Sequence, residues 1–207
     1  MIEGTDGVGR TTQIEHLRNW LEVQGHGVVE TGWTRSELMS SLIELAKEGN
    51  TLTRDTFSLL YATDFADRLE SQVLPALRSG FIVLADRYVY TAFARDAVRG
   101  KDPRWIRDVF GFAPVPDLVC YLKIDVDALI PRVIESGGMN YWEAGMDMHL
   151  GDDLFDSFKK YQSILIGDYD KMAEEFGFEV IDARGKVDDI QSAIRERVSK
   201  AVLPAGK

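Results

Sequence analysis

The sequence has little cysteine, little histidine and no long apolar run, and each shortage excludes a class of protein. Its single cysteine, Cys120, cannot form an internal disulfide. The histidines number only 3, and no cluster of Cys and His has the spacing of a zinc site. The longest apolar run beside an expected strand, Phe81 to Ala85, is far too short to span a bilayer. The first residues are polar, unlike a secretory signal. We therefore expect a soluble protein of the reducing cytoplasm that has no membrane partner.

Basic residues are scarce relative to acidic ones. Lys and Arg number 24 and Asp and Glu number 34, which gives a formal net charge of −10. The isoelectric point of the chain is near 4.8. A chain of this charge is repelled by a phosphate backbone, so we expect no nucleic-acid partner. Small anionic ligands can still bind, but only in a local pocket of positive groups.

The order of apolar and amphipathic segments predicts an α/β fold. No repeat or linker divides the 207 residues, which predicts one domain over residues 1–207. Short apolar runs alternate with longer amphipathic stretches, as in βα units around a mostly parallel sheet. The expected strands are Val28–Glu30, Phe81–Ala85, Leu118–Lys123 and Glu179–Ile181. The expected helices are Thr11–Gln24, Ser36–Glu48, Arg54–Ser79, Val89–Val98, Asp125–Glu135, Asp153–Phe176 and Val187–Val202.

The beginning of the chain leaves little room for a first strand. A glycine-rich loop starts at Gly4, so only two or three residues precede it. Such a loop normally follows a full central strand, whose absence would leave backbone groups of its neighbours unpaired. The strand is therefore either very short or truncated, and we favour the interpretation that residues upstream of Met1 are missing.

The segment from Gly4 to Thr12 has the spacing of a phosphate-binding P-loop. Gly7 and Gly9 allow the backbone to turn its N–H groups inward and allow phosphate oxygens to come close. The helix that follows directly favours an anion at its N-terminus. The Thr11 hydroxyl is placed to hold Mg²⁺. Arg10 departs from the motif, which has lysine there; arginine keeps the charge but is longer and planar.

Charged residues follow the buried strand Phe81–Ala85. Asp86, Arg87 and Tyr88 stand at its carboxyl end, where parallel sheets bind ligands. Asp86 could hold Mg²⁺ or accept a proton from an attacking group. Arg87 could bind a phosphate through two N–H groups at once. Together with the P-loop, these residues predict a nucleotide-phosphate site.

The chain resembles the thymidylate kinase family. The resemblance covers nearly the whole chain and is carried by four motifs in order: Glu3 to Gln13, Asp86-Arg87-Tyr88, Pro116 to Leu122, and Ile181 to Arg184. It implies a three-layer P-loop fold with a five-stranded parallel sheet flanked by helices. It also implies transfer of the γ-phosphoryl group of Mg-ATP to dTMP, a homodimer, and a lid over about residues 136–152.

The resemblance also implies roles for individual residues. The P-loop segment Asp6, Gly7, Val8, Gly9, Arg10, Thr11 and Thr12 would bind ATP, and Arg184 and Lys186 would border the adenine. Thr11 and Asp86 would be the metal site, and Arg10, Asp86 and Arg87 the catalytic residues. The residues expected to bind the acceptor nucleotide are Asp6, Trp33, Arg35, Phe65, Arg68, Arg87, Tyr88, Arg95, Asp96 and Tyr141.

Three departures from the family pattern bear on catalysis and specificity. The first is Arg10, in place of the lysine of the P-loop. The second is that the segment from Ser136 to Leu154 contains no Arg or Lys, although family members place catalytic arginines in the lid or the P-loop. Either Arg10 serves both roles, or Arg132 moves in from just before the lid, or catalysis is weak.

The third departure concerns recognition of the base. Arg95 and Asp96 stand where the family has an aromatic residue and a glutamine that read thymine. An ionised aspartate only accepts hydrogen bonds, which suits a base edge with N–H donors. Alternatively, the two residues pair with each other or with Arg68 and only shape the pocket. Phe65 stands where an arginine is expected, and Arg68, one helical turn later, could substitute for it.

These observations predict a nucleoside monophosphate kinase that acts on dTMP. The first alternative is a kinase of the same fold that takes another nucleotide, or a nucleoside, as acceptor. The second alternative is a nucleotide-binding protein with little or no transfer activity. Nucleotide binding without turnover would identify the second alternative.

Overall fold

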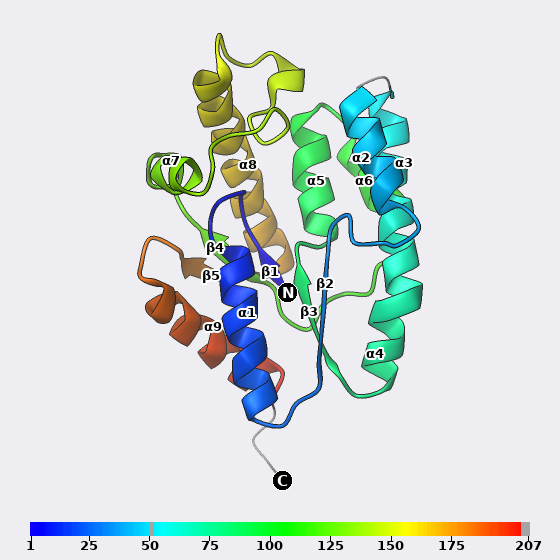
Figure 1. The fold of residues 1–207 in the computed structure, drawn as a ribbon, viewed down its shortest axis with the longest axis vertical. Helices are drawn as coiled ribbons and strands as arrows, with labels where there is room; N and C mark the ends of the chain where they lie inside the picture. Colours follow the sequence, from blue (N-terminus) through cyan, green and yellow to red (C-terminus); the bar gives the residue numbers. More distant parts are fainter. Residues whose placement is uncertain (50–51, 204–207) are drawn as a thin grey trace.

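The computed structural model describes residues 1–49 and 52–203 and has a five-stranded parallel sheet (Figure 1). The strands are β1 (Ile2–Glu3), β2 (Val28–Gly32), β3 (Ile82–Asp86), β4 (Cys120–Lys123) and β5 (Glu179–Asp182). Their order across the sheet is β2-β3-β1-β4-β5, and every neighbouring pair is parallel. The predicted α/β fold with helices around a parallel sheet is confirmed.

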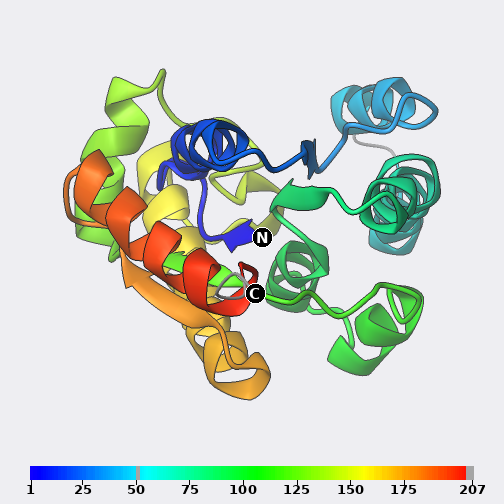
Figure 2. The same cartoon turned by 90° about the horizontal axis from the view of Figure 1, so that it is seen from below.

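Helices cover both faces of the sheet and enclose two hydrophobic cores. One core joins the sheet to α1 (Arg10–Val23), α7 (Val126–Glu135) and α9 (Val187–Ala201). The other joins it to α3 (Arg54–Arg68), α5 (Val89–Val98), α6 (Pro103–Val109) and α8 (Leu154–Phe176). The remaining α-helices are α2 (Ser40–Gly49) and α4 (Leu74–Arg78). Figure 2 shows α9 and the α2–α3 pair at opposite sides of the molecule.

Residue alternation along the strands explains why both faces are apolar. In β4, Cys120 and Leu122 contribute to the core with α1 and α9, whereas Tyr121 contributes to the core with α5 and α8. Successive side chains of a strand point to opposite faces, so a strand buried on both sides reads as a continuous apolar run. Helix α1 buries Ile14, Leu17 and Leu21, which recur at the spacing of one helix face.

The first strand contains only the two residues that lie between Met1 and the glycine-rich loop. Ile2 pairs with Asp86 of β3 on one side and Cys120 of β4 on the other, and Glu3 pairs with Tyr121. These few residues place the glycine-rich loop in the middle of the sheet, beside the carboxyl ends of β3 and β4.

Some predicted boundaries are wrong for identifiable reasons. The expected helix Arg54–Ser79 is interrupted by a π-helical turn, η1 (Leu69–Val73), just before Pro75. A proline lacks the N–H and crowds the carbonyl of the preceding turn, which a wider turn relieves. Helix α2 begins at Ser40 rather than Ser36. Helix α6 was not predicted, although Asp102 at its N-cap and Pro103 at its first position are a start signal.

Within the described residues, we find no helix that is both long and apolar enough to span a membrane.

Candidate active site

The P-loop adopts a backbone that only glycine tolerates at several positions. Gly7 and Gly9 have φ angles of 79° and 100°. A Cβ atom on Gly7 would lie 2.4 Å from Cγ2 of Val133 on α7, so the loop also needs glycine for close packing. Helix α1 begins at Arg10, directly after the loop. The loop therefore presents a helix N-terminus to the site, an arrangement that favours bound phosphate.

Arg10 folds back onto its own loop. Its Nη1 donates to the carbonyl oxygens of Gly4, at 2.5 Å, and of Thr5, and its Nε donates to Oδ1 of Asp86 at 2.8 Å. The side chain is buried between these acceptors, with 8% of the residue exposed. Arg10 therefore braces the loop against the end of β3 in this structure.

Asp86 and Thr11, the expected metal ligands, lie together. The Thr11 hydroxyl donates to Oδ2 of Asp86 at 3.1 Å, while Oδ1 of the same carboxylate accepts from Arg10. A hydroxyl and a carboxylate are hard oxygen donors of the kind that Mg²⁺ prefers, so the residues fit this ion. No cluster of three or more His, Cys, Asp or Glu side chains with metal-ligand placement occurs in residues 1–49 and 52–203. Phosphate oxygens and water would therefore complete the coordination of Mg²⁺ here.

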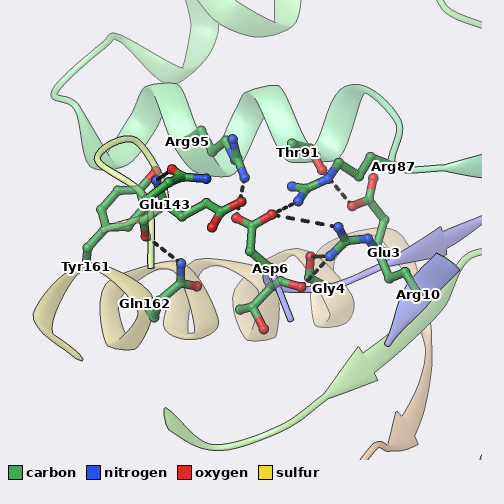
Figure 3. Close-up of polar contacts among 12 residues, drawn as sticks. Glu3, Gly4, Asp6, Arg10, Arg87, Thr91, Arg95, Glu143, Tyr161 and Gln162 are labelled. Atoms are coloured by element: carbon green, nitrogen blue, oxygen red, sulfur yellow. Dashed lines mark hydrogen bonds and ion pairs between the residues drawn. The ribbon is translucent and has the colours of Figure 1, made fainter. Parts of the chain in front are cut away.

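Three arginines converge on Asp6 (Figure 3). Arg87 donates to its Oδ1, Arg95 donates to its Oδ2 at 2.5 Å, and Nη2 of Arg10 lies 3.8 Å from Oδ1. Burial, followed by the nearby positive charge of Arg95, lowers the pKa of Arg87 to about 10. Arg87 also has a φ of 71°, a strained value for a residue other than glycine. The site therefore holds concentrated positive charge around one carboxylate, within an acidic protein.

Glu3 anchors the start of α5 and was not among the predicted site residues. Its fully buried carboxylate accepts from the backbone N of Tyr88 at 2.7 Å and from the hydroxyls of Thr91 and Tyr169 at 2.9 and 3.1 Å. Desolvation raises the pKa of Glu3 above its ordinary value of 4.5, although the hydrogen bonds from Thr91 and Tyr88 oppose the shift. The carboxylate thereby fixes the segment that carries Arg87. The acidic residue in an otherwise apolar strand was the available signal.

The raised pKa of Glu3 predicts a pH-dependent stability. The folded protein holds this proton more tightly than the unfolded chain, so the stabilisation is complete below pH 4.5 and is lost as pH rises through the higher folded pKa. Relative to the variant Glu3→Gln, wild type should lose about 1.4 kcal/mol of unfolding free energy per unit of upward shift. Urea denaturation from about pH 5 to pH 8 measures this difference.

The exposed Glu37 provides the matched control for that series, since Glu37→Gln should keep the pH profile of wild type. Parallel profiles for wild type and Glu3→Gln would contradict the prediction.

A cavity of about 650 Å³ opens beside the P-loop. Such a volume is typical of small-molecule sites. The predicted site residues that line it are Asp6, Trp33, Arg35, Asp86, Arg87, Arg95, Asp96 and Tyr141. A second crevice of about 380 Å³ lies between the P-loop and residues 136–143, and Asp6, Asn140 and Glu143 border both spaces. Asp6 therefore stands at the junction of the two cavities.

A buried ion pair positions one wall of the larger cavity. Asp64 accepts from Nε of Arg68 at 2.9 Å and from the backbone N–H groups of Thr34 and Ser36 at 3.3 and 3.1 Å. It thereby holds the loop that carries Arg35. The Arg35 side chain lies across Gly32, where a Cβ atom would come within 3.1 Å of Nε.

Three residues predicted to bind the acceptor do not line either cavity. Phe65 and Tyr88 are buried in an aromatic cluster, with their ring centroids 5.0 Å apart. Arg68 is committed to Asp64 and to the hydroxyl of Thr31, at 3.1 Å. The structure therefore brings Arg68 beneath the wall of the cavity rather than into it.

Arg95 and Asp96 pair neither with each other nor with Arg68 among the described contacts. Arg95 reaches Asp6, and Oδ2 of Asp96 accepts from the hydroxyl of Ser58 at 2.6 Å. Burial raises the pKa of Asp96 above its ordinary value. Both residues line the cavity, so they shape it through separate partners.

The segment 136–152 is fastened to the body of the protein at several points. Ser157 and Gln162 of α8 donate to the carbonyl oxygens of Ala144 and Glu143 at 2.7 and 2.8 Å. Arg99 donates twice to Asp147, at 2.8 and 3.0 Å. Arg99 and Asp147 both line the larger cavity and were not among the predicted residues. Their separation of 48 positions in sequence gave no local signal of the pair.

Aromatic contacts also hold the segment 136–152 against the cavity. Trp142 stacks on Phe57 of α3, with ring centroids 5.6 Å apart and planes at 20°. Phe57 also meets Tyr61 edge-on, and Tyr61 meets Trp33, whose Nε1 donates to the backbone oxygen of Tyr88 at 3.0 Å. The cavity is therefore cationic near the P-loop and aromatic at these walls.

The remaining predicted ATP-binding residues lie outside the two cavities. The Val8 side chain is buried in the core, and Thr12 is exposed on α1. Arg184 is exposed at the end of β5 and pairs with Asp182, and Lys186 is the N-cap residue of α9. The described contacts therefore do not link these four residues to either cavity.

Comparison with known proteins shows consistent similarity. The family model described as thymidylate kinase matches residues 2–194. A probable thymidylate kinase 2 of Saccharolobus solfataricus is 42% identical over 198 residues, which cover 94% of this chain and 92% of the relative. A probable thymidylate kinase of Pyrococcus horikoshii is 30% identical, covering 98% and 96%. A thymidylate kinase of Clavibacter michiganensis is 34% identical, covering 99% and 95%.

Proposed function

The chain belongs to the thymidylate kinase family, and from this we propose that it transfers the γ-phosphoryl group of ATP to dTMP, giving ADP and dTDP. The observation that carries the proposal is the match over residues 2–194. The site supports it, because a P-loop and a cavity of about 650 Å³ meet at Asp6. ATP would lie along the P-loop and dTMP in the cavity.

The chemistry follows from the charges of the two substrates. Two phosphate groups must approach each other, so catalysis consists of positioning them and offsetting their repulsion. Arg35 and Arg87 line the cavity and would hold the phosphate of the acceptor. Thr11 and Asp86 would hold Mg²⁺, which when bound neutralises charge on the ATP phosphates. The backbone N–H groups of the P-loop would bind the same phosphates.

We propose that residues 136–152 act as the lid of this site. Asn140, Tyr141, Trp142 and Glu143 line the larger cavity, so the segment already covers the acceptor side. Closing over bound substrates would exclude water, which favours transfer to dTMP over hydrolysis of ATP.

The homodimer and the cytoplasmic location that the resemblance implies are also part of the proposal. Leu38, Leu42 and Leu45 are 64%, 49% and 64% exposed and follow helical spacing along α2 and the turn before it. A stripe of exposed leucines suits a surface covered by a second copy of the chain. Light scattering on the purified protein measures the mass, and a monomer at micromolar concentration would contradict the dimer.

A panel of acceptors tests the proposed activity. ADP release from Mg-ATP would be followed with dTMP, dUMP, dCMP, dGMP, UMP and CMP, and the nucleoside diphosphate product would be identified by chromatography. We expect dTMP to give the highest kcat/KM. Turnover only with a nucleotide that carries another base would keep the kinase function and assign the different base preference to the cavity wall that carries Asp96. ATP binding without turnover on any acceptor would contradict the kinase function.

A further inference from the structure

Arg95 lies at the place where the two proposed substrates meet. Its Nη2 donates to Oδ2 of Asp6 at 2.5 Å, and Asp6 borders both the cavity for the acceptor and the crevice beside the P-loop. Figure 3 shows the Arg95 side chain descending from α5 toward Asp6. A guanidinium at this junction can reach a phosphoryl group that moves from one space to the other.

Arg87 also donates to Asp6, whereas the hydrogen bonds of Arg10 and Arg132 go to other acceptors. Arg10 is bound to two loop carbonyls and to Asp86. Arg132 donates to the carbonyl oxygen of Val8 at 3.3 Å and lines neither cavity. The segment 136–152 contains no Lys or Arg, so it brings no positive charge when it covers the site.

Arg95 keeps most of its donors available. A guanidinium has five N–H groups. Among the described residues, the hydrogen bond to Asp6 is the one that the Arg95 side chain makes. A carboxylate and a phosphoryl group offer similar oxygens, so Arg95 can exchange Asp6 for a phosphoryl oxygen without changing its own position much. Arg87 donates to the other carboxylate oxygen of Asp6, so the two guanidiniums are close enough to act on one anion.

We infer that Arg95 is a catalytic residue that binds the transferring phosphoryl group and offsets its charge in the transition state. The inference rests on the proposed kinase function. An oxygen of the acceptor phosphate forms the new bond to the γ-phosphorus, and the bond from that phosphorus to the β–γ bridging oxygen breaks. The electron pair of the broken bond stays on the β-phosphate of ADP. Arg95 donates hydrogen bonds throughout and transfers no proton. Asp6 positions the guanidinium between turnovers.

The test compares kcat with KM in arginine variants. Arg95→Met, which keeps the length and removes the charge, should lower kcat by about 10²–10³-fold. The KM values for dTMP and ATP should change by less than about 3-fold, because the interaction is made mainly in the transition state. Arg95→Lys should retain more activity than Arg95→Met. Added guanidinium ion should restore part of the kcat of Arg95→Ala, a rescue that a purely structural role would not produce.

Controls separate this inference from its alternatives. Arg104→Met, at an exposed position of α6, should leave kcat unchanged. A kcat of Arg95→Met near that of wild type, with a raised KM for dTMP, would show that Arg95 only binds the acceptor and would overturn the inference. A larger loss in Arg132→Met than in Arg95→Met would overturn it as well. Wild type without turnover would instead overturn the proposed function, and the inference with it.

Discussion

Replacing Asp86 with alanine is expected to lower kcat by about 10³-fold, the loss typical of removing one preorganised electrostatic group. Its carboxylate holds Nε of Arg10 at 2.8 Å and the hydroxyl of Thr11 at 3.1 Å. Without this carboxylate, the proposed Mg²⁺ site loses its negative ligand. Arg10 also loses the hydrogen bond that holds its guanidinium group against the end of β3. Initial rates of ADP formation at saturating dTMP and Mg-ATP measure the effect.

Two further variants sharpen that experiment. Asp86→Asn keeps an oxygen acceptor for Arg10 but removes the charge, so its kcat should lie between those of wild type and Asp86→Ala. Asp108→Ala, on the exposed surface of α6, should match wild type. A kcat for Asp86→Ala within about 10-fold of wild type would contradict the role assigned to Asp86.

Replacing Asp64 with alanine is expected to lower the free energy of unfolding by about 3–5 kcal/mol. The side chains of Asp64 and Arg68 are 0% and 3% exposed, so the variant leaves a buried charge without its partner. Burial already lowers the pKa of Arg68, and Asp64 opposes that shift. The variant also frees the N–H groups of Thr34 and Ser36, so the KM for dTMP should rise as Arg35 loses its support. Urea denaturation and steady-state kinetics measure the two effects.

A double-variant cycle identifies the cause of that loss. Adding Arg68→Met to Asp64→Ala removes the unpaired charge and should recover part of the lost stability. Asp55→Ala, which removes an exposed carboxylate of the same helix from its ion pair with Lys101, should cost less than about 1 kcal/mol. Equal losses for Asp55→Ala and Asp64→Ala would rule out the buried charge as the cause.

The fold could largely be predicted from local patterns. An amphipathic stretch identified α1, and apolar runs identified β2, β3, β4 and β5, because burial of one helix face or of a whole strand requires those patterns. The glycines of the P-loop and the charged end of β3 predicted where phosphate would bind, because parallel strands present their carboxyl ends at one edge. The π-helical turn η1 and the helix α6 were not predicted, although Pro75 follows the first closely and Asp102 with Pro103 marks the start of the second.

The amino-acid sequence by itself determined the family, the order of the elements and the loop that faces phosphate. The tertiary structure decided which arginine serves which partner. Arg10 turns to its own loop and Asp86, Arg68 is committed to Asp64, and Arg95 reaches Asp6 at a separation of 89 positions. A guanidinium on a long side chain can reach several acceptors. Which acceptor it binds depends on which carboxylates the fold brings near and on how deeply they are buried. Neither property can be predicted from spacing along the chain.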